Sequence, residues 1–207
     1  MDGLTADLRR TLEQWVPPDA EQAALRDVFA EHAARHDHPG ARSCAPDHVT
    51  ASALVISAEG DRVVLVLHPK FGRWLQTGGH CEPGDRSMAA AALREAEEET
   101  GIDGLRIDPV PVLLSRHPVR CHAGGHHLDV QYVAVAPADS EPRCSDESDQ
   151  VAWFGVDDLP AGADDSVRHL VAAAVHNHSP ACPQVCPQAV ETQAERTIDP
   201  SAPHRLR

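Results

Sequence analysis

The stretch GGHCEPGD at residues 78–85, followed by REAEEETGI at residues 94–102, decides the interpretation of this sequence. Residues 88–100 consist almost entirely of the strong helix formers Ala, Leu, Arg and Glu, and Gly101 follows where a glycine commonly ends a helix. On such a helix Glu95, Glu98 and Glu99 share one face, with their side chains about 5–6 Å apart. The sequence therefore predicts a helix with three like charges on one side.

A cation bound to these glutamates would offset their mutual repulsion, which costs roughly a few tenths of a kcal/mol per pair. Oxygen ligands suit Mg²⁺ or Mn²⁺ better than zinc. The simpler alternative for the glutamates by themselves is a solvated acidic face. The preceding loop favours the metal, because Gly78 and Gly79 let the backbone approach a ligand closely and Pro83-Gly84 forms a tight turn. A backbone carbonyl could then join the metal ligands.

This arrangement resembles the signature of the Nudix hydrolase superfamily, G-x5-E-x7-R-E-U-x-E-E-x-G-U, in which U is a bulky aliphatic residue. Residues 94–102 fit its second half, with a small Ala96 at the first U position. The first half fits from Gly79, with Asp85 in place of the usual glutamate. Eight residues instead of seven separate Asp85 from Arg94, and placing the extra residue at the loop-to-helix junction leaves the helical phase of the glutamates unchanged. The role of Asp85 is therefore the weakest transfer from the family.

The resemblance covers residues 49–176 and is that of a bacterial Nudix subgroup. Further segments that carry it are WLQ at 74–76, HHLD at 126–129 and SDESD at 145–149. It implies an α/β (α+β) fold, in which a Nudix-type mixed β-sheet is sandwiched between helices. The signature loop and helix would form the site for the metal and the diphosphate.

The resemblance also implies a role for each signature residue. Glu95, Glu98 and Glu99 would hold Mg²⁺ or Mn²⁺ together with the carbonyl of Gly79, and Arg94 would orient the glutamates through salt bridges. The usual substrate is a nucleoside diphosphate linked to another moiety. The metal would neutralise the pyrophosphate and lower the pKa of a bound water that attacks one phosphorus.

The general base is left open between a signature-helix glutamate and an acid from a distant loop. We expect Glu98 first and Glu147 second as the catalytic base, beside Arg94. Glu147 belongs to an acidic run, for which a solvated loop is the simpler interpretation.

Substrate contacts are expected from four residues outside the signature, namely Arg73, His127, Asp129 and Gln131. Asp129 and Gln131 share one face of the strand that alternation predicts at residues 128–136. This polar face could bind part of a substrate.

Four histidines gather around the glycines at positions 124 and 125: His117, His122, His126 and His127. This density could bind a transition metal or contact phosphates. No Cys or His spacing here matches a closed tetrahedral zinc site, so we expect these histidines to line a mobile loop.

The chain is expected to have three parts. Residues 1–48 form an N-terminal helical extension, with an apolar stripe in the first helix and a capping-box-like start of the second at Asp19. Residues 49–177 form the Nudix domain, and residues 178–207, which are rich in proline and poor in large apolar residues, form a disordered tail. Within the domain we predict a closing helix and strands at 49–57, 62–68, 110–115, 128–136 and 151–156.

The composition of this 207-residue chain argues against some classes of binding partner. Its net charge of −14 opposes binding to nucleic acid or to anionic membranes. No apolar run approaches the roughly 20 residues that span a bilayer, and the N-terminus lacks the pattern of a secretory signal. A cytoplasmic location with reduced cysteines is the resulting expectation.

The leading hypothesis is a metal-dependent diphosphate hydrolase. The alternative is a catalytically inactive Nudix-fold sensor of nucleotides or sugar nucleotides, which degenerate signature glutamates would indicate, whereas all three are present. The N-terminal helices either pack on the domain, which we favour, or form the interface of a homodimer or of another partner. The substrate stays open among sugar nucleotides, ADP-ribose, dinucleoside polyphosphates and modified nucleoside triphosphates.

Overall fold

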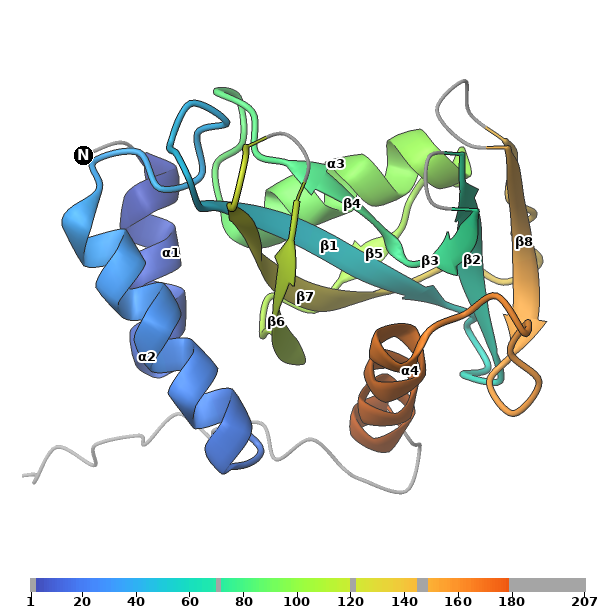
Figure 1. Ribbon diagram of the computed structural model, residues 1–207. Coiled ribbons are helices and arrows are strands. Elements are labelled where there is room, and N and C mark those ends of the chain that lie inside the picture. The colour runs from blue at the N-terminus through green and yellow to red at the C-terminus, as the bar shows by residue number, and fades with distance from the viewer. Residues whose placement is uncertain (1–2, 70–71, 120–121, 145–148, 179–207) are drawn as a thin grey trace, which may run out of the picture.

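The computed structural model describes residues 3–69, 72–119, 122–144 and 149–178 (Figure 1). Glu147, the second candidate base, and residues 179–207 of the predicted tail lie outside the described residues. None of the described helices combines the length and the apolar character needed to cross a membrane.

The described chain forms four helices and eight strands, in an order that mixes the two. The helices are α1 (Gly3–Gln14), α2 (Ala20–Arg35), α3 (Met88–Thr100) and α4 (Asp165–His178). The strands are β1 (His48–Ile56), β2 (Arg62–His68), β3 (Arg73–Leu75), β4 (Thr77–His80), β5 (Arg106–Ile107), β6 (Leu113–Pro118), β7 (His126–Val135) and β8 (Gln150–Gly155).

All eight strands join one mixed sheet with the order β3-β2-β1-β7-β5. The central β1 runs parallel to β7 and antiparallel to β2 and β4, while β6 pairs with β7 and β8 with β2. Figure 1 shows α3 and α4 on opposite sides of this sheet. The predicted mixed sheet between helices is therefore confirmed.

Alternation along β1 divides the interior into two cores. Val49, Ala51 and Ala53 face the core that includes α3, whereas Leu54 and Ile56 face the core that includes α4. Thr50 and Ser52 lie on the same face as Leu54, and both are buried although they are polar. The α4 side of the sheet is thus apolar at one end of β1 and polar at the other.

The N-terminal helices pack on the sheet, which is the alternative we favoured. Their apolar side chains belong to the same core as α3. The indole nitrogen of Trp15 donates to the carbonyl of Pro111 at 2.6 Å. The side-chain amide of Gln22 donates to the carbonyl of Leu114 at 3.1 Å and accepts from the backbone N–H of Leu114 at 2.7 Å.

The segment around the signature glycines differs from the predicted loop, because residues 77–80 form strand β4 against β1. Gly78 has φ +155°, and a Cβ there would lie 2.3 Å from the Cβ of Ser52, so the close pairing requires glycine. The strand predicted at residues 110–115 begins later, at Leu113, and continues to Pro118 as β6. The proline at position 111 has no N–H to donate to a strand partner.

Candidate active site

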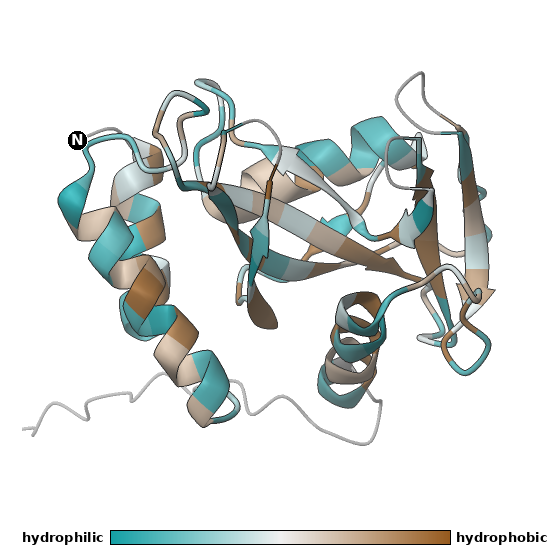
Figure 2. Cartoon of the chain, viewed as in Figure 1, coloured by the Kyte–Doolittle hydropathy of each residue, from teal (hydrophilic) through white to brown (hydrophobic). Residues whose placement is uncertain are grey.

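The signature helix α3 has the predicted bounds, and its ends are capped. The Ser87 side chain accepts a hydrogen bond from the backbone N–H of Ala90 at 3.0 Å, and Gly101 ends the helix with φ +62°. The helix is continuous from Met88 to Thr100, so Glu95, Glu98 and Glu99 have the helical spacing that we expected. Figure 2 shows α3 apolar at its start and hydrophilic over the glutamates.

The Arg94 guanidinium connects the two halves of the signature. Its Nε and Nη2 donate to the two carboxylate oxygens of Asp85, each at 3.2 Å, and Nη2 also donates to the carbonyl of His80 at 3.0 Å. Its Nη1 donates to Glu95 Oε1 at 3.0 Å and to Glu98 Oε2 at 2.9 Å. One cation therefore holds carboxylates from both the loop and the helix.

Asp85 has a definite place in this arrangement despite the irregular spacing. Its side chain is only 6% exposed, and its Oδ2 accepts the backbone N–H of Glu82 at 2.7 Å. The hydrogen bonds from Arg94 to Asp85 are the largest cause of the raised pKa of Arg94. Asp85 therefore anchors the guanidinium that contacts the glutamates.

Glu95 and Glu99 lie against the backbone of β4. A Cβ at Gly79 would lie 2.7 Å from the carboxyl carbon and from both oxygens of Glu95, so a larger residue there would displace this carboxylate. Glu99 accepts the backbone N–H of Gly78 at 3.2 Å. Carboxylates beside backbone carbonyls are the all-oxygen donor set that Mg²⁺ and Mn²⁺ prefer, so these residues fit such an ion.

The carboxylates of Glu95, Glu98 and Glu99 nevertheless do not converge on one point in this structure. Among the described residues, the groups of three or more metal-binding side chains with ligand atoms within 4.8 Å of one another consist of histidines and a cysteine. Glu98 is 60% exposed and contacts Arg94. Part of the positive charge that the acidic face needs is thus supplied by the chain itself, and side-chain rotation would be needed to gather the glutamates on one ion.

Asp129 and Gln131, predicted to contact substrate, lie together on β7 and are both buried. The Asp129 carboxylate accepts from Thr50 Oγ1 at 2.9 Å, from Ser52 Oγ at 2.6 Å and from Gln131 Nε2 at 3.2 Å. Asp129 is only 3% exposed, and these hydrogen bonds offset the cost of burying its polar side chain. The polar face predicted for this strand exists, and its groups bond to one another across β1 and β7.

The prediction that four histidines line one loop is wrong for three of them. His117 lies on β6, and His126 and His127 lie on β7, which leaves His122 in the connecting turn. The ligand atoms of His127, His48 and His80 lie within 4.8 Å of one another. Sequence reasoning missed the latter two, because residues on three separate strands share no recognisable spacing.

Burial makes these imidazoles poor bases. Desolvation, followed by the charges of neighbouring histidines, lowers the pKa of His48 to about 4 and that of His127 to about 3. Desolvation, followed by the charge of Arg42, also lowers the pKa of His80. The three rings are therefore neutral at pH 7.

Arg73 does not lie beside the other predicted substrate-binding residues on β7. It lies on the edge strand β3, separated from β7 by β2 and β1. Its guanidinium makes an exposed ion pair with Asp164 at 3.5 Å.

Comparisons with known proteins point to one family. A family model described as NUDIX domain matches residues 46–174. A NUDIX-family hydrolase from Clostridium perfringens is 24% identical over 63% of this chain and 97% of its own, with a TM-score of 0.53.

Two further solved structures are similar. The dihydroneopterin triphosphate pyrophosphohydrolase of E. coli is 18% identical over 62% of this chain and 95% of its own, with a TM-score of 0.52. The NUDIX domain of Shewanella oneidensis NrtR, solved with ADP ribose, is 21% identical over 72% of this chain and 97% of its own, with a TM-score of 0.51. At these identities the structural likenesses concern the fold.

Proposed function

Because this chain belongs to the Nudix family of hydrolases, which act on pyrophosphate bonds in nucleoside diphosphate derivatives, we propose that it is a Mg²⁺- or Mn²⁺-dependent member. It cleaves the diphosphate linkage between a nucleoside and another moiety. The observation that carries the proposal is the set of contacts around Arg94, which joins Asp85, Glu95 and Glu98 at hydrogen-bond distance. These contacts hold the loop carboxylate and two of the three signature glutamates together, as a metal-binding site on this helix requires.

Glu95, Glu98 and Glu99, with the carbonyl of Gly79, would hold the metal. When bound, a divalent ion neutralises the pyrophosphate and lowers the pKa of water. Arg94 positions two of the three carboxylates, and Asp85 fixes Arg94.

Glu98 is our first candidate for the base. Its exposed carboxylate can accept a proton from water as the water oxygen bonds to phosphorus and the bond from phosphorus to the bridging oxygen breaks. The freed bridging oxygen leaves on the second phosphate product. Glu147 remains the second candidate.

The substrate is a small molecule, and the net charge of −14 opposes nucleic acid as an alternative. His127, Asp129 and Gln131 remain candidates for the substrate side because they share one face of β7. Arg73 remains a candidate for a phosphate contact that would replace its exposed ion pair with Asp164.

A screen of nucleoside diphosphate derivatives tests the proposal. Sugar nucleotides, dinucleoside polyphosphates, modified nucleoside triphosphates and ADP-ribose, the ligand of the Shewanella oneidensis domain, are incubated with the full chain and Mg²⁺ or Mn²⁺. We expect phosphate or nucleotide release from at least one compound and none with excess EDTA. Full activity of the metal-stripped chain in EDTA would contradict metal dependence, and tight binding without turnover would support the sensor alternative.

The substitution Glu98→Gln tests whether Glu98 takes part in the reaction. It keeps the size of the side chain and removes its charge, so turnover should fall roughly 100-fold or more. Glu97→Gln on the same helix is the matched control and should keep turnover within about twofold. Equal rates for the two variants would return Glu98 to the solvated acidic face.

A further inference from the structure

Three histidines form a cluster on the opposite side of β4 from the signature glutamates. Side chains alternate along a strand, so Gly79 faces Glu95 on α3 whereas the next residue, His80, faces away from it. His48 begins β1 and lies directly across from His127 of β7 in the parallel register. The cluster therefore joins three strands that are far apart in sequence.

The ring nitrogens of this cluster converge. Nε2 of His48 and Nε2 of His80 lie 3.0 Å apart, and the ligand atoms of all three residues lie within 4.8 Å of one another. Two nitrogens that face each other can share only one proton, so at least one of them presents a lone pair. In a tetrahedral zinc site with Zn–N bonds of about 2.0–2.1 Å, the nitrogens are about 3.3 Å apart, so small movements would suffice.

His48 also has an unused polar atom. Its side chain is fully buried, and among the described residues its Nδ1 has no hydrogen-bond partner. An ion bound through Nε2 would not satisfy this nitrogen, which needs a water or another partner of its own. The convergence of the ring nitrogens is therefore the observation that carries the site.

We propose that His48, His80 and His127 bind a first-row transition-metal ion of the Zn²⁺ type. Imidazole ligands suit such an ion and do not suit Mg²⁺, so this site is chemically distinct from the signature carboxylates. Three protein ligands leave the fourth position open to water or an anion. Arg42 acts electrostatically on all three rings, which favours an anion there, such as hydroxide or a phosphate oxygen.

A second group of possible ligands, His32, His36 and Cys44, must be distinguished from this cluster. It is the weaker candidate, because burial raises the pKa of the Cys44 thiol and binding requires the thiolate. The Nδ1 atom of His36 also lies 2.9 Å from the carbonyl oxygen of His32, at hydrogen-bond distance, so it is already engaged.

The test measures Zn²⁺ bound to the full chain after chelator treatment and dialysis, by titration calorimetry and by metal analysis. We expect one tightly bound Zn²⁺ per chain and a rise in Tm on binding, because the ion stabilises only the folded state. His80→Ala and His127→Ala should each weaken Zn²⁺ binding roughly 100-fold and abolish the rise in Tm. Co²⁺ bound in place of Zn²⁺ should show no thiolate charge-transfer absorption, since all three ligands are nitrogen.

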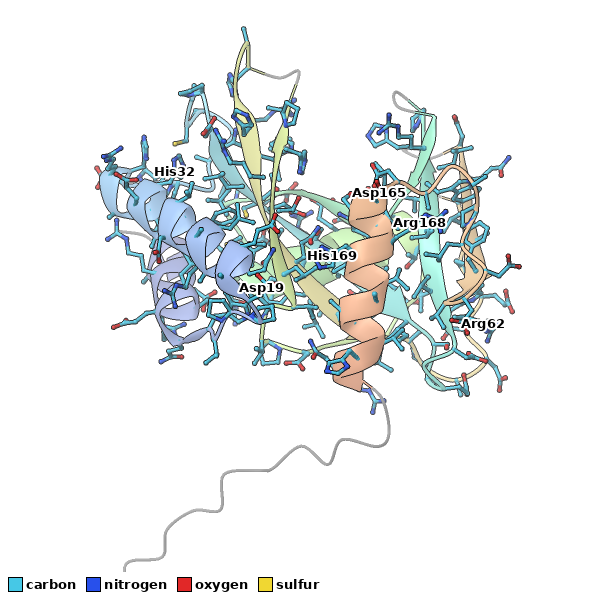
Figure 3. The ribbon with its side chains drawn as sticks, turned by 60° about the horizontal axis from the view of Figure 1, so that its bottom comes forward. Asp19, His32, Arg62, Asp165, Arg168 and His169 are labelled. Carbon is cyan, nitrogen blue, oxygen red and sulfur yellow. The ribbon has the colours of Figure 1, made fainter. Side chains whose placement is uncertain are left out.

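Matched variants make each outcome decisive. Cys44→Ser removes the competing group, and His169→Ala removes an exposed histidine of α4 (Figure 3); both should bind Zn²⁺ as the wild type does. If His80→Ala fails to fold by circular dichroism, His80→Gln replaces it. The proposal is overturned by a wild type that binds no Zn²⁺, by unchanged binding in the folded His80 and His127 variants, or by loss of binding in Cys44→Ser.

Discussion

The two sides of strand β4 are built on opposite electrostatic principles. On the α3 side, carboxylates surround the guanidinium of Arg94, which offsets part of their negative charge, and part of the group remains exposed. On the other side, the hydrogen-bonded Asp129 and the imidazole of His48 are buried, and the neutral imidazoles of His80 and His127 are half-buried. The adjacent residues Gly79 and His80 face these two environments, so a single short strand separates the carboxylates around Arg94 from a cluster of neutral imidazoles.

The two sides offset the free-energy cost of burying polar groups in different ways. The positive charge of Arg94 lies among the carboxylates, and an added metal ion would supplement it. The histidines avoid the cost by staying neutral, because desolvation lowers their pKa values. The following changes separate the two sides, from the largest expected effect to the smallest.

Gly78→Ala should disrupt both sides together. The new Cβ would lie 2.3 Å from Ser52 Cβ and 2.9 Å from the carbonyl oxygen of Ala51, at a φ of +155° that other residues rarely adopt. We expect the free energy of unfolding to fall by about 3 kcal/mol or more, measured by urea denaturation. Gly84→Ala, where a Cβ meets nothing within 4 Å, is the control and should change it by less than about 0.5 kcal/mol. Similar losses in both variants would mean that β4 does not require this close contact.

Acidification should weaken the histidine side. In the unfolded chain an imidazole has a pKa near 6.5, whereas burial in the folded chain lowers that of His48 to about 4. Below about pH 6.5 the unfolded state therefore binds protons that the folded state does not, and the free energy of unfolding decreases as the pH falls toward 4. Between pH 7 and pH 5 the loss from His48 is about 2 kcal/mol.

Urea unfolding at the two pH values measures this effect. His48→Gln should reduce the difference between pH 7 and pH 5, whereas His169→Ala should leave it unchanged. An unaltered pH dependence in a folded His48→Gln would show that other groups cause it.

Asp85→Asn acts on the carboxylate side alone. It removes the charge that fixes Arg94 and should lower the free energy of unfolding by about 1 kcal/mol. Turnover should fall about tenfold, because the guanidinium is held less firmly against Glu95 and Glu98. Glu82→Gln is the control, since Glu82 is 64% exposed and lies 4.0 Å from Arg94 Nη1; equal effects of the two changes would argue against an anchoring role for Asp85.

Ending the chain at residue 178 should affect neither side. The removed residues are rich in proline and polar side chains, which cannot offset a backbone ordering cost of about 1–2 kcal/mol per residue. We expect Tm within a degree or two of that of the full chain and metal-dependent turnover within about twofold. A larger loss in thermal unfolding or turnover would mean that the tail contacts the domain.

The signature side could be predicted from the sequence because its determinants are local. Helix formers, the Ser87 cap and the Gly101 end fix α3, and the spacing of the glutamates follows from helix geometry. β4 was missed because two consecutive glycines have low strand propensity, and the strand exists through its pairing with β1. The histidine side depends on register among β1, β4 and β7, and no local pattern near His48 or His80 indicates that register.

The hydrogen bonds between Gln22 and Leu114 have a consequence for how the chain behaves in a crowded solution. Among the strands that the structure describes, β6 pairs with β7 alone, so its outer peptide groups could recruit a strand from another molecule. The carboxamide of Gln22 offers one donor and one acceptor, as a peptide group does, and occupies both the N–H and the carbonyl of Leu114. Helix α2 thereby blocks the sheet edge at this point and protects the chain from edge-to-edge aggregation.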